Sequence, residues 1–173
     1  AAGERSGRVQ VTVSDGGDGS YECTYRCAGA GAYRLHVQVE GVELPRSPFD
    51  LTVRPSYLDA SSSSAEGAGL LSAEAGESAV FTVCPRDKMG NFIASSVNDH
   101  LGRLKARVVH KESSSRAEVW LRHAGDGALD VCYRPLLAGP HEIWLTFEGK
   151  PLPGCPHAVH VRPGPLQPTN CLL

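Results

Sequence analysis

Residues 126–134, Asp-Gly-Ala-Leu-Asp-Val-Cys-Tyr-Arg, decide the fold because a related stretch stands 108 positions earlier. Residues 18–26 read Asp-Gly-Ser-Tyr-Glu-Cys-Thr-Tyr-Arg and align with them without gaps. The match extends to a shared Arg-Pro, and 14 of the 38 residues from 18 to 55 equal those from 126 to 163. Self-similarity at a fixed period is the sequence signature of a repeated structural unit. Residues 1–55 therefore correspond to 109–163.

Between the shared turn residues, apolar side chains alternate with polar ones, which is typical of strands with one buried face. Val9, Val11 and Val13 show this alternation, and the second copy repeats it. Seven strands are expected in the complete unit, near residues 70–73, 81–83, 104–108, 117–121, 129–133, 143–147 and 159–161. Seven short strands in about 100 residues, separated by Gly, Pro and Asp turns, indicate an all-β, immunoglobulin-like antiparallel β-sandwich.

The repeat also divides the chain. Residues 1–55 are predicted to be the C-terminal half of one repeat, and 69–163 a complete seven-stranded repeat. Residues 56–68, rich in serine, are expected to be a linker, and 164–173 a C-terminal tail. The first half-repeat lacks three strands, so it should expose strand edges and half of its core.

The composition excludes several classes of function. Lys and Arg number 17 against 19 Asp and Glu, a formal charge of −2, so no surface built to neutralise nucleic acid is indicated. No apolar run approaches the roughly 20 residues of a membrane helix, so membrane insertion is not expected. The six cysteines form no C-x2-C pair and no N-glycosylation acceptor is present. A reducing compartment, and hence a cytoplasmic location, is predicted.

The order of motifs resembles filamin-type immunoglobulin repeats (the filamin/ABP280 repeat family). The opening of such a repeat is similar to residues 69–91, with Gly-Leu, Ala-Gly-Glu, Phe-Thr-Val, Arg-Asp and Gly-Asn in sequence. The closing strands are similar to Asp-Gly before a Tyr-x-Tyr-like strand and to Ser47-Pro48-Phe49. The second copy departs from the pattern at Cys155-Pro156-His157. The actin-binding domains of filamins form a separate region, so the resemblance implies no actin binding here.

No catalytic or metal-binding arrangement emerges from the residues, so no enzyme and no cofactor are expected. His157 and His160 would point to opposite faces of one strand and could not share an ion. No nucleophile stands beside a base in a recognised motif. Cys84 and Cys132 lie on strands that the resemblance makes neighbours, so a cross-strand disulfide is geometrically possible. Two free thiols are expected instead, given the predicted reducing compartment.

The resemblance implies a binding site for extended peptides, since partners of this family pair with the edge of the third strand and pack toward the fourth. The corresponding segments are 104–110 and 116–122, and the physical mode is β-augmentation. Candidate partner-binding residues are Leu104, Lys105, Arg107, Val109, Trp144 and Trp120. The alternation predicts an outward Trp144 and Val109 beside the two basic residues; a neighbouring repeat or a loop could equally cover Trp144. Trp120 should face outward from the opposite sheet, where a contact between repeats is one possibility.

The function expected from these observations is a non-enzymatic scaffold module, possibly associated with the cytoskeleton, that spaces domains and binds proteins by strand addition. Its partners would be extended peptides, neighbouring repeats or a second copy of the chain. Two alternatives remain open. One is a recognition or oligomerisation region of a ubiquitin ligase, and the other is an adhesion ectodomain, which a Cys84–Cys132 disulfide would support.

Overall fold

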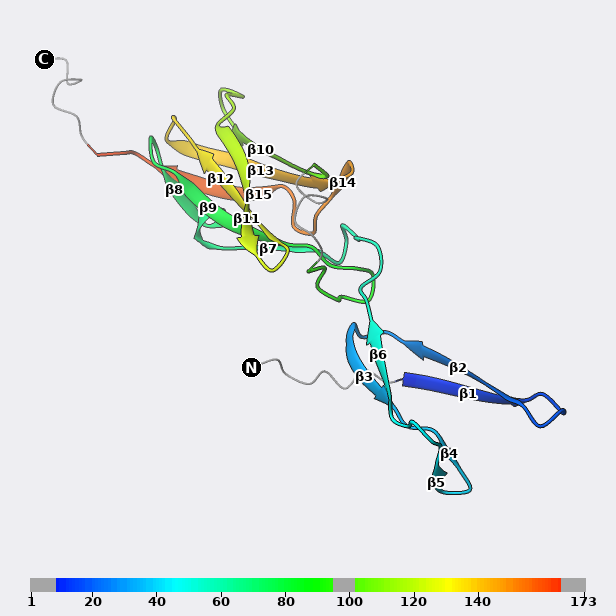
Figure 1. Cartoon of the computed structure of the whole chain (residues 1–173). Coiled ribbons are helices and arrows are strands. Elements are labelled where there is room, and N and C mark those ends of the chain that lie inside the picture. The colour runs from blue at the N-terminus through cyan, green and yellow to red at the C-terminus, as the bar shows by residue number, and fades with distance from the viewer. Residues whose placement is uncertain (1–8, 95–101, 166–173) are drawn as a thin grey trace, which may run out of the picture. The chain divides into compact units, whose positions relative to one another are not determined.

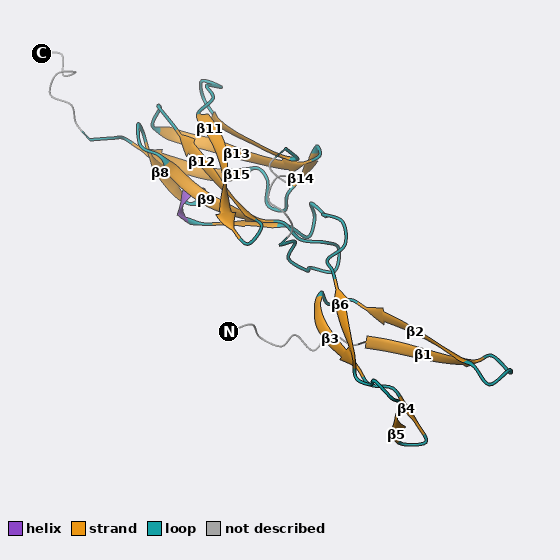
Figure 2. Ribbon diagram, viewed as in Figure 1, coloured by secondary structure: helices purple, strands orange, loops and turns teal. Residues whose placement is uncertain are grey.

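A computed structural model of the chain describes residues 9–94 and 102–165 (Figure 1). The described residues are almost entirely strands and loops, with one short 3-10 helix (Figure 2). The chain divides into two compact units, residues 1–56 and 57–173. The all-β class predicted from the alternating pattern is therefore confirmed.

The first unit contains three separate strand pairs. Its strands are β1 (Val9–Asp15), β2 (Tyr21–Cys27), β3 (Gly31–Leu35), β4 (Gln38–Val39), β5 (Val42–Glu43) and β6 (Phe49–Val53). β1 pairs with β2, β3 with β6, and β4 with β5, all antiparallel. No side chain in the described residues 9–56 is fully buried. Alternating apolar residues such as Val11 and Val13 are exposed.

The second unit is a two-sheet sandwich. Its elements are β7 (Ser64–Glu66), η1 (Ala68–Leu70), β8 (Ser72–Glu74), β9 (Ala79–Cys84), β10 (Leu104–His110), β11 (Glu118–Gly125), β12 (Ala128–Arg134), β13 (Gly139–Phe147), β14 (Lys150–Pro151) and β15 (His157–Arg162). One sheet has the order β10-β13-β15-β8, with β14 added to β13, and the other has the order β11-β12-β9-β7. β10 is the edge strand of the first sheet and β11 is the edge strand of the second. These two edge strands form one side of the sandwich.

The core lies between the two sheets and is supplied by the period-2 apolar positions. On β13, Ile143, Leu145 and Phe147 are buried, and on β12 Val131 and Tyr133 are buried. Every second residue of each strand therefore faces the partner sheet, as the alternation predicted.

The expected linker at 56–68 is the main correction to the sequence-based organisation. Most of this stretch packs within the second unit, where Ala60 and Ser63 are buried and Ser64–Glu66 pairs with β9. The serines that suggested a flexible linker instead form turn hydrogen bonds, including those from Ser62 to the carboxylate of Asp59. Small polar residues that satisfy backbone and carboxylate groups are compatible with order as well as with flexibility.

The first strand of the complete unit is divided between the two sheets. β7 pairs antiparallel with β9, whereas β8 pairs parallel with β15 in the other sheet. The expected strand near 70–73 begins instead at Ser72, because η1 occupies Ala68–Leu70. Gly69 permits this crossing, since a Cβ atom there would lie 2.6 Å from the carbonyl oxygen of Val80. The predicted seven strands are all present, together with β7 and the two-residue β14.

The two units share local backbone conformations at the repeat offset of 108 residues. Glu40 and Glu148 have φ of 50° and 49°, and the glycines that follow them have φ of 80° and 83°. Strands β2, β3 and β6 correspond by position to β12, β13 and β15. The internal repeat found in the sequence is therefore also a structural repeat.

The Tyr133 hydroxyl connects β12 to η1, and its removal should weaken the second unit. This fully buried hydroxyl donates a 2.6 Å hydrogen bond to the carbonyl oxygen of Gly69, and burial raises the pKa of Tyr133 to about 12. Tyr133→Phe leaves that carbonyl without this donor, so we expect the free energy of unfolding to fall by about 1–3 kcal/mol. Urea titration followed by tryptophan fluorescence measures this unit alone, because both tryptophans lie in it.

The same hydroxyl predicts a pH dependence at high pH. The folded pKa lies above the ordinary value of about 10, so the stabilisation is complete below pH 10 and is lost as the pH rises toward 12. Tyr133→Phe should remove this part of the decline. An equal decline in the variant would contradict the assignment.

Candidate functional site

The side of the second unit formed by the edges of β10 and β11 carries an open groove. The groove has a volume of about 710 Å³ and is lined by Gly102, Leu104, Lys105, Ala106, Val119, Trp120 and Leu121. Each wall comes from the end strand of a different sheet. The groove therefore opens where the two sheets of the sandwich separate.

Hydrogen bonds on either side of β10 show which of its main-chain groups face the groove. The N–H of Lys111 donates to Pro140 and the carbonyl of Arg103 accepts from Glu148, so odd-numbered residues point toward the β13 side. The carbonyl of Val108 and the N–H of His110 instead bond to residues 117 and 115, on the β11 side. Because main-chain direction alternates along a strand, the N–H and C=O groups of Leu104 and Ala106 point into the groove.

The same alternation applies to the opposite wall. The N–H of Ala117 donates to Val108, so the main-chain groups of Ala117, Val119 and Leu121 face away from β12 and toward β10. The side chains of Val119 and Leu121 pack on the core, whereas those of Glu118 and Arg122 are exposed on the opposite face of β11. Both walls thus offer main-chain groups above an apolar floor.

The predicted site residue Leu104 lies on the core side of β10. Its side chain is buried, so it can offer a partner only its backbone. Ala106, the next residue on the same face, is half-buried and lines the groove. Ala106, Val119 and Leu121 were not among the candidates predicted from the sequence. They could have been found as core-facing positions on the two strands expected at a sheet edge.

Lys105, Arg107 and Trp144 come together on the outer face of this sheet, as the alternation predicted. Both basic side chains are exposed, and Arg107 is paired in register with Trp144 on β13. The guanidinium carbon of Arg107 lies 5.2 Å from the centre of the Trp144 ring, within the range of a cation–π contact. The outward tryptophan is therefore half-covered by an arginine of its own sheet.

A hairpin closes one end of the groove, which shortens the predicted edge. Val109 forms a bridge with Arg116, and His110 donates its N–H to Ser115, so β10 already has a partner beyond residue 107. The expected edge of 104–110 is thereby reduced to Leu104–Arg107. Val109, one of the predicted site residues, lies outside this open part.

Two buried histidines hold that hairpin in place. The rings of His110 and His141 meet edge to face with centres 4.9 Å apart, and Nδ1 of His110 accepts the N–H of Ser113 at 3.1 Å. Burial is the main cause that lowers the pKa of His141, so its ring is neutral at pH 7. A neutral His141 ring avoids the cost of burying a charge at this position, and the hairpin remains a fixed end of the groove.

Trp120 occupies the outer face of the other sheet, as expected. It is 39% exposed, faces away from the core-packed Val119 and Leu121, and is one of the residues at the groove. It comes from the opposite wall to Lys105 and Arg107. The structure therefore does not group it with Trp144.

The register of β9 and β12 separates Cys84 from Cys132. Cys132 lies opposite Val80, four residues from Cys84 along β9, which is about 14 Å at the usual rise per residue. A disulfide requires Cα atoms within about 7 Å, so the bond considered possible from the sequence cannot form. Both cysteines are free thiols.

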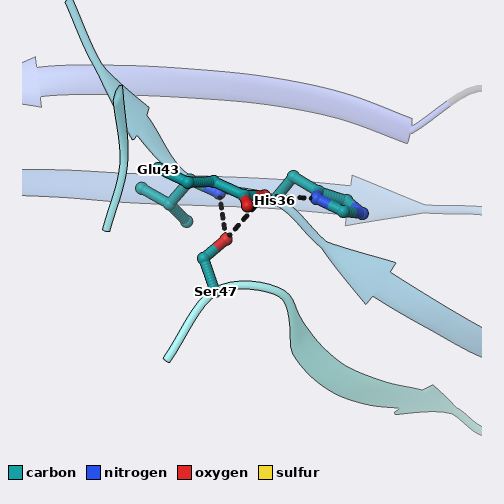
Figure 3. A network of polar contacts seen from close by, with 4 residues as sticks. His36, Glu43 and Ser47 are labelled. Carbon is teal, nitrogen blue, oxygen red and sulfur yellow. Dashed lines mark hydrogen bonds and ion pairs between the residues drawn. The ribbon is translucent and has the colours of Figure 1, made fainter. Parts of the chain in front are cut away.

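The first unit contains an exposed polar network of His36, Glu43 and Ser47 (Figure 3). Nδ1 of His36 lies 2.6 Å from Oε1 of Glu43, and the Ser47 hydroxyl donates to the same carboxylate at 3.3 Å. The hydrogen bond to His36 is the main cause that lowers the pKa of Glu43. The serine contacts the carboxylate rather than the imidazole, so these three residues do not form a nucleophile–base pair, and the network instead joins the residues around β4 and β5.

Within residues 9–94 and 102–165, no three His, Cys, Asp or Glu side chains gather in a way that could hold a metal ion. No helix in those ranges is long and apolar enough to cross a bilayer.

Comparison with known proteins identifies relatives of the chain. The Filamin/ABP280 repeat model matches residues 2–50 and 57–158. Filamin-C of Mus musculus is 30% identical over 156 residues, which cover 90% of this chain and 5% of the relative. Filamin-A of Drosophila melanogaster is 30% identical over 148 residues, which cover 84% of this chain and 6% of the relative. The chain thus spans only about a twentieth of these relatives.

Solved structures show the same architecture. The Lin-41 filamin domain superposes with a TM-score of 0.53 at 25% identity, covering 62% of this chain and 98% of that domain. FdeC, an adhesin of Escherichia coli, has a TM-score of 0.63 at 22% identity, covering 92% of this chain and 49% of the adhesin. At the latter identity the likeness concerns the fold alone.

Proposed function

The chain belongs to the Filamin/ABP280 repeat family, and we propose that it is a non-enzymatic scaffold module that binds extended segments of partner proteins by strand addition. The partner strand pairs with the open edge Leu104–Arg107 of β10 and lies in the groove between β10 and β11. Neighbouring repeats and a second copy of the chain are candidate partners as well as other proteins. The relation to filamins supports a cytoplasmic place beside the cytoskeleton.

The observation that carries this proposal is that a strand edge with no partner strand among the described residues lies beside an apolar groove. Leu104 and Ala106 direct their main-chain groups into the groove, and Ala106, Val119 and Leu121 provide an apolar floor beneath them. An added strand gains main-chain hydrogen bonds from such an edge, and alternate side chains enter the groove. The hairpin at residues 108–117 sets one limit of the partner strand.

Filling the groove tests this proposal. Twelve-residue peptides are first selected from a random display library on the 173-residue chain, and their dissociation constants are measured by fluorescence anisotropy. Ala106→Arg places a long side chain in the groove, and we expect affinity to fall at least about tenfold, since partner side chains lose their site. The half-exposed position should keep the fold intact.

Leu71→Arg is the matched control for this experiment. Leu71 is 78% exposed and lines a different groove, beside Pro156 and Ala158 at the start of β15. We expect it to leave peptide affinity unchanged. Peptides that lose affinity with Leu71→Arg but not with Ala106→Arg would place binding at the groove beside Leu71 and refute the proposed site.

A further inference from the structure

The cations near the groove differ in whether they already have a carboxylate partner. Three of them form ion pairs: Arg103 with Glu148 at 3.5 Å, Lys111 with Glu142 at 3.2 Å, and Arg122 with Asp130 at 3.1 Å. Lys105 and Arg107 form no ion pair with any residue in the described parts of the chain, and Arg107 contacts the ring of Trp144. In a chain with a formal charge of −2, these two exposed cations stand side by side on the open stretch of β10.

Their neighbours in the sheet supply no negative charge. Lys105 lies opposite Thr146 and Arg107 opposite Trp144 on β13. The two acids nearest on that face each have a cation partner already: Glu148, just past the end of β13, pairs with Arg103, and Glu142, opposite Val109, pairs with Lys111. Glu118 of β11 is exposed on the outer face of the other sheet, opposite in direction to the core-packed Val119. The outer face at residues 105–107 is therefore locally basic.

The pleat fixes which residues of an added strand would meet these cations. Residues directly opposite each other in paired strands project to the same face. Positions opposite Leu104 and Ala106 would therefore point into the apolar groove, and positions opposite Lys105 and Arg107 would point to the basic outer face. The small side chain of Ala106 leaves room for an apolar side chain of the partner between β10 and β11.

Resting on the proposed strand addition, we propose that the preferred partner is an extended segment with alternating apolar and acidic residues. The apolar residues enter the groove beside Ala106, Val119 and Leu121, and the acidic residues face Lys105 and Arg107. Charge complementarity on the rim then selects acidic segments from the many sequences whose main chain could pair with the edge.

Three blocked nine-residue peptides test this partner class on the 173-residue chain. All have valine at the odd positions, and the even positions are glutamate, threonine or lysine. We expect the glutamate peptide to bind about tenfold more tightly than the threonine peptide, a difference of about 1.4 kcal/mol. The lysine peptide should bind weakest, and 0.5 M NaCl should remove most of the glutamate advantage, since exposed charges are screened.

Charge-neutral variants separate the partner class from strand addition itself. Lys105→Gln with Arg107→Gln should abolish the glutamate advantage, whereas Lys88→Gln with Arg162→Gln removes two exposed cations elsewhere and should preserve it. Equal binding of the glutamate and threonine peptides, both weakened by Ala106→Pro, would overturn the acidic preference and leave strand addition standing. Absence of binding by all three peptides at millimolar concentration would overturn both.

Discussion

Proline at position 106 is expected to reduce the affinity for selected peptides at least about 30-fold. The substitution removes a main-chain donor that faces the groove and leaves a carbonyl of the partner strand unpaired, a loss of about 2 kcal/mol or more. The fold should tolerate the change, because the N–H of Ala106 points away from β13 and proline is found on edge strands with this orientation. Fluorescence anisotropy gives the affinity, and thermal unfolding gives the stability.

Arg107→Pro is the stability comparison for this substitution, because the N–H that it removes faces β13 instead of the groove. It also removes the Arg107 side chain, so its effect on stability and not on peptide affinity is the quantity compared. The N–H of Arg107 faces β13, so its removal breaks the ladder inside the sheet and should cost about 2 kcal/mol of stability. The pair of variants thus separates loss of binding from loss of fold. Wild-type affinity in a folded Ala106→Pro variant would mean that peptides do not use this edge.

Alanine at position 127 is expected to lower the free energy of unfolding of the second unit by about 3 kcal/mol or more. Gly127 has φ of +87°, a left-handed conformation that costs other residues about 1–2 kcal/mol. A Cβ atom there would also lie 2.5 Å from the carbonyl oxygen of Ile93 and 2.9 Å from Cα of Ala94. Backbone atoms cannot move aside without disturbing the loop, and overpacking adds about 1–3 kcal/mol.

Gly149→Ala provides the matched comparison. Gly149 occupies the corresponding position of another two-residue hairpin turn in the same unit, with φ of +83°, and a Cβ atom there meets nothing within 4 Å. We expect it to cost only the conformational part, about 1–2 kcal/mol. Urea unfolding followed by tryptophan fluorescence measures both, and equal costs would show that the contact with Ile93 is unimportant.

Much of the fold could be predicted because the relevant signals are local. The period-2 alternation in strands such as Ile143 to Phe147 indicates which side chains face the core, and the repeated Asp-Gly and Glu-Gly turns mark where strands end. The same alternation correctly placed Lys105, Arg107 and Trp144 together on an outer face. The number and spacing of the strands indicate the fold. The outward direction of these three side chains follows from the pleat of each strand.

The features that could not be predicted depend on contacts between distant segments. The hairpin that covers Val109 and the pairing of Ser64–Glu66 with β9 are set by tertiary contacts, which local composition does not reveal. Strand register, which separates Cys84 from Cys132, cannot be read from alternation, because a shift of two residues preserves every face. The groove residues were missed for a related reason, since Val119 and Leu121 look like ordinary core positions until both sheet edges are placed.

Hydrogen exchange at the Ala106 amide tests strand addition most directly. This N–H faces the groove, whereas the N–H of neighbouring Lys105 faces β13. Saturation with a selected peptide should slow exchange of the Ala106 amide at least about tenfold and leave that of Lys105 nearly unchanged, because only the former gains a hydrogen-bond acceptor. Unchanged exchange at Ala106 in the presence of a saturating bound peptide would contradict strand addition at the β10 edge.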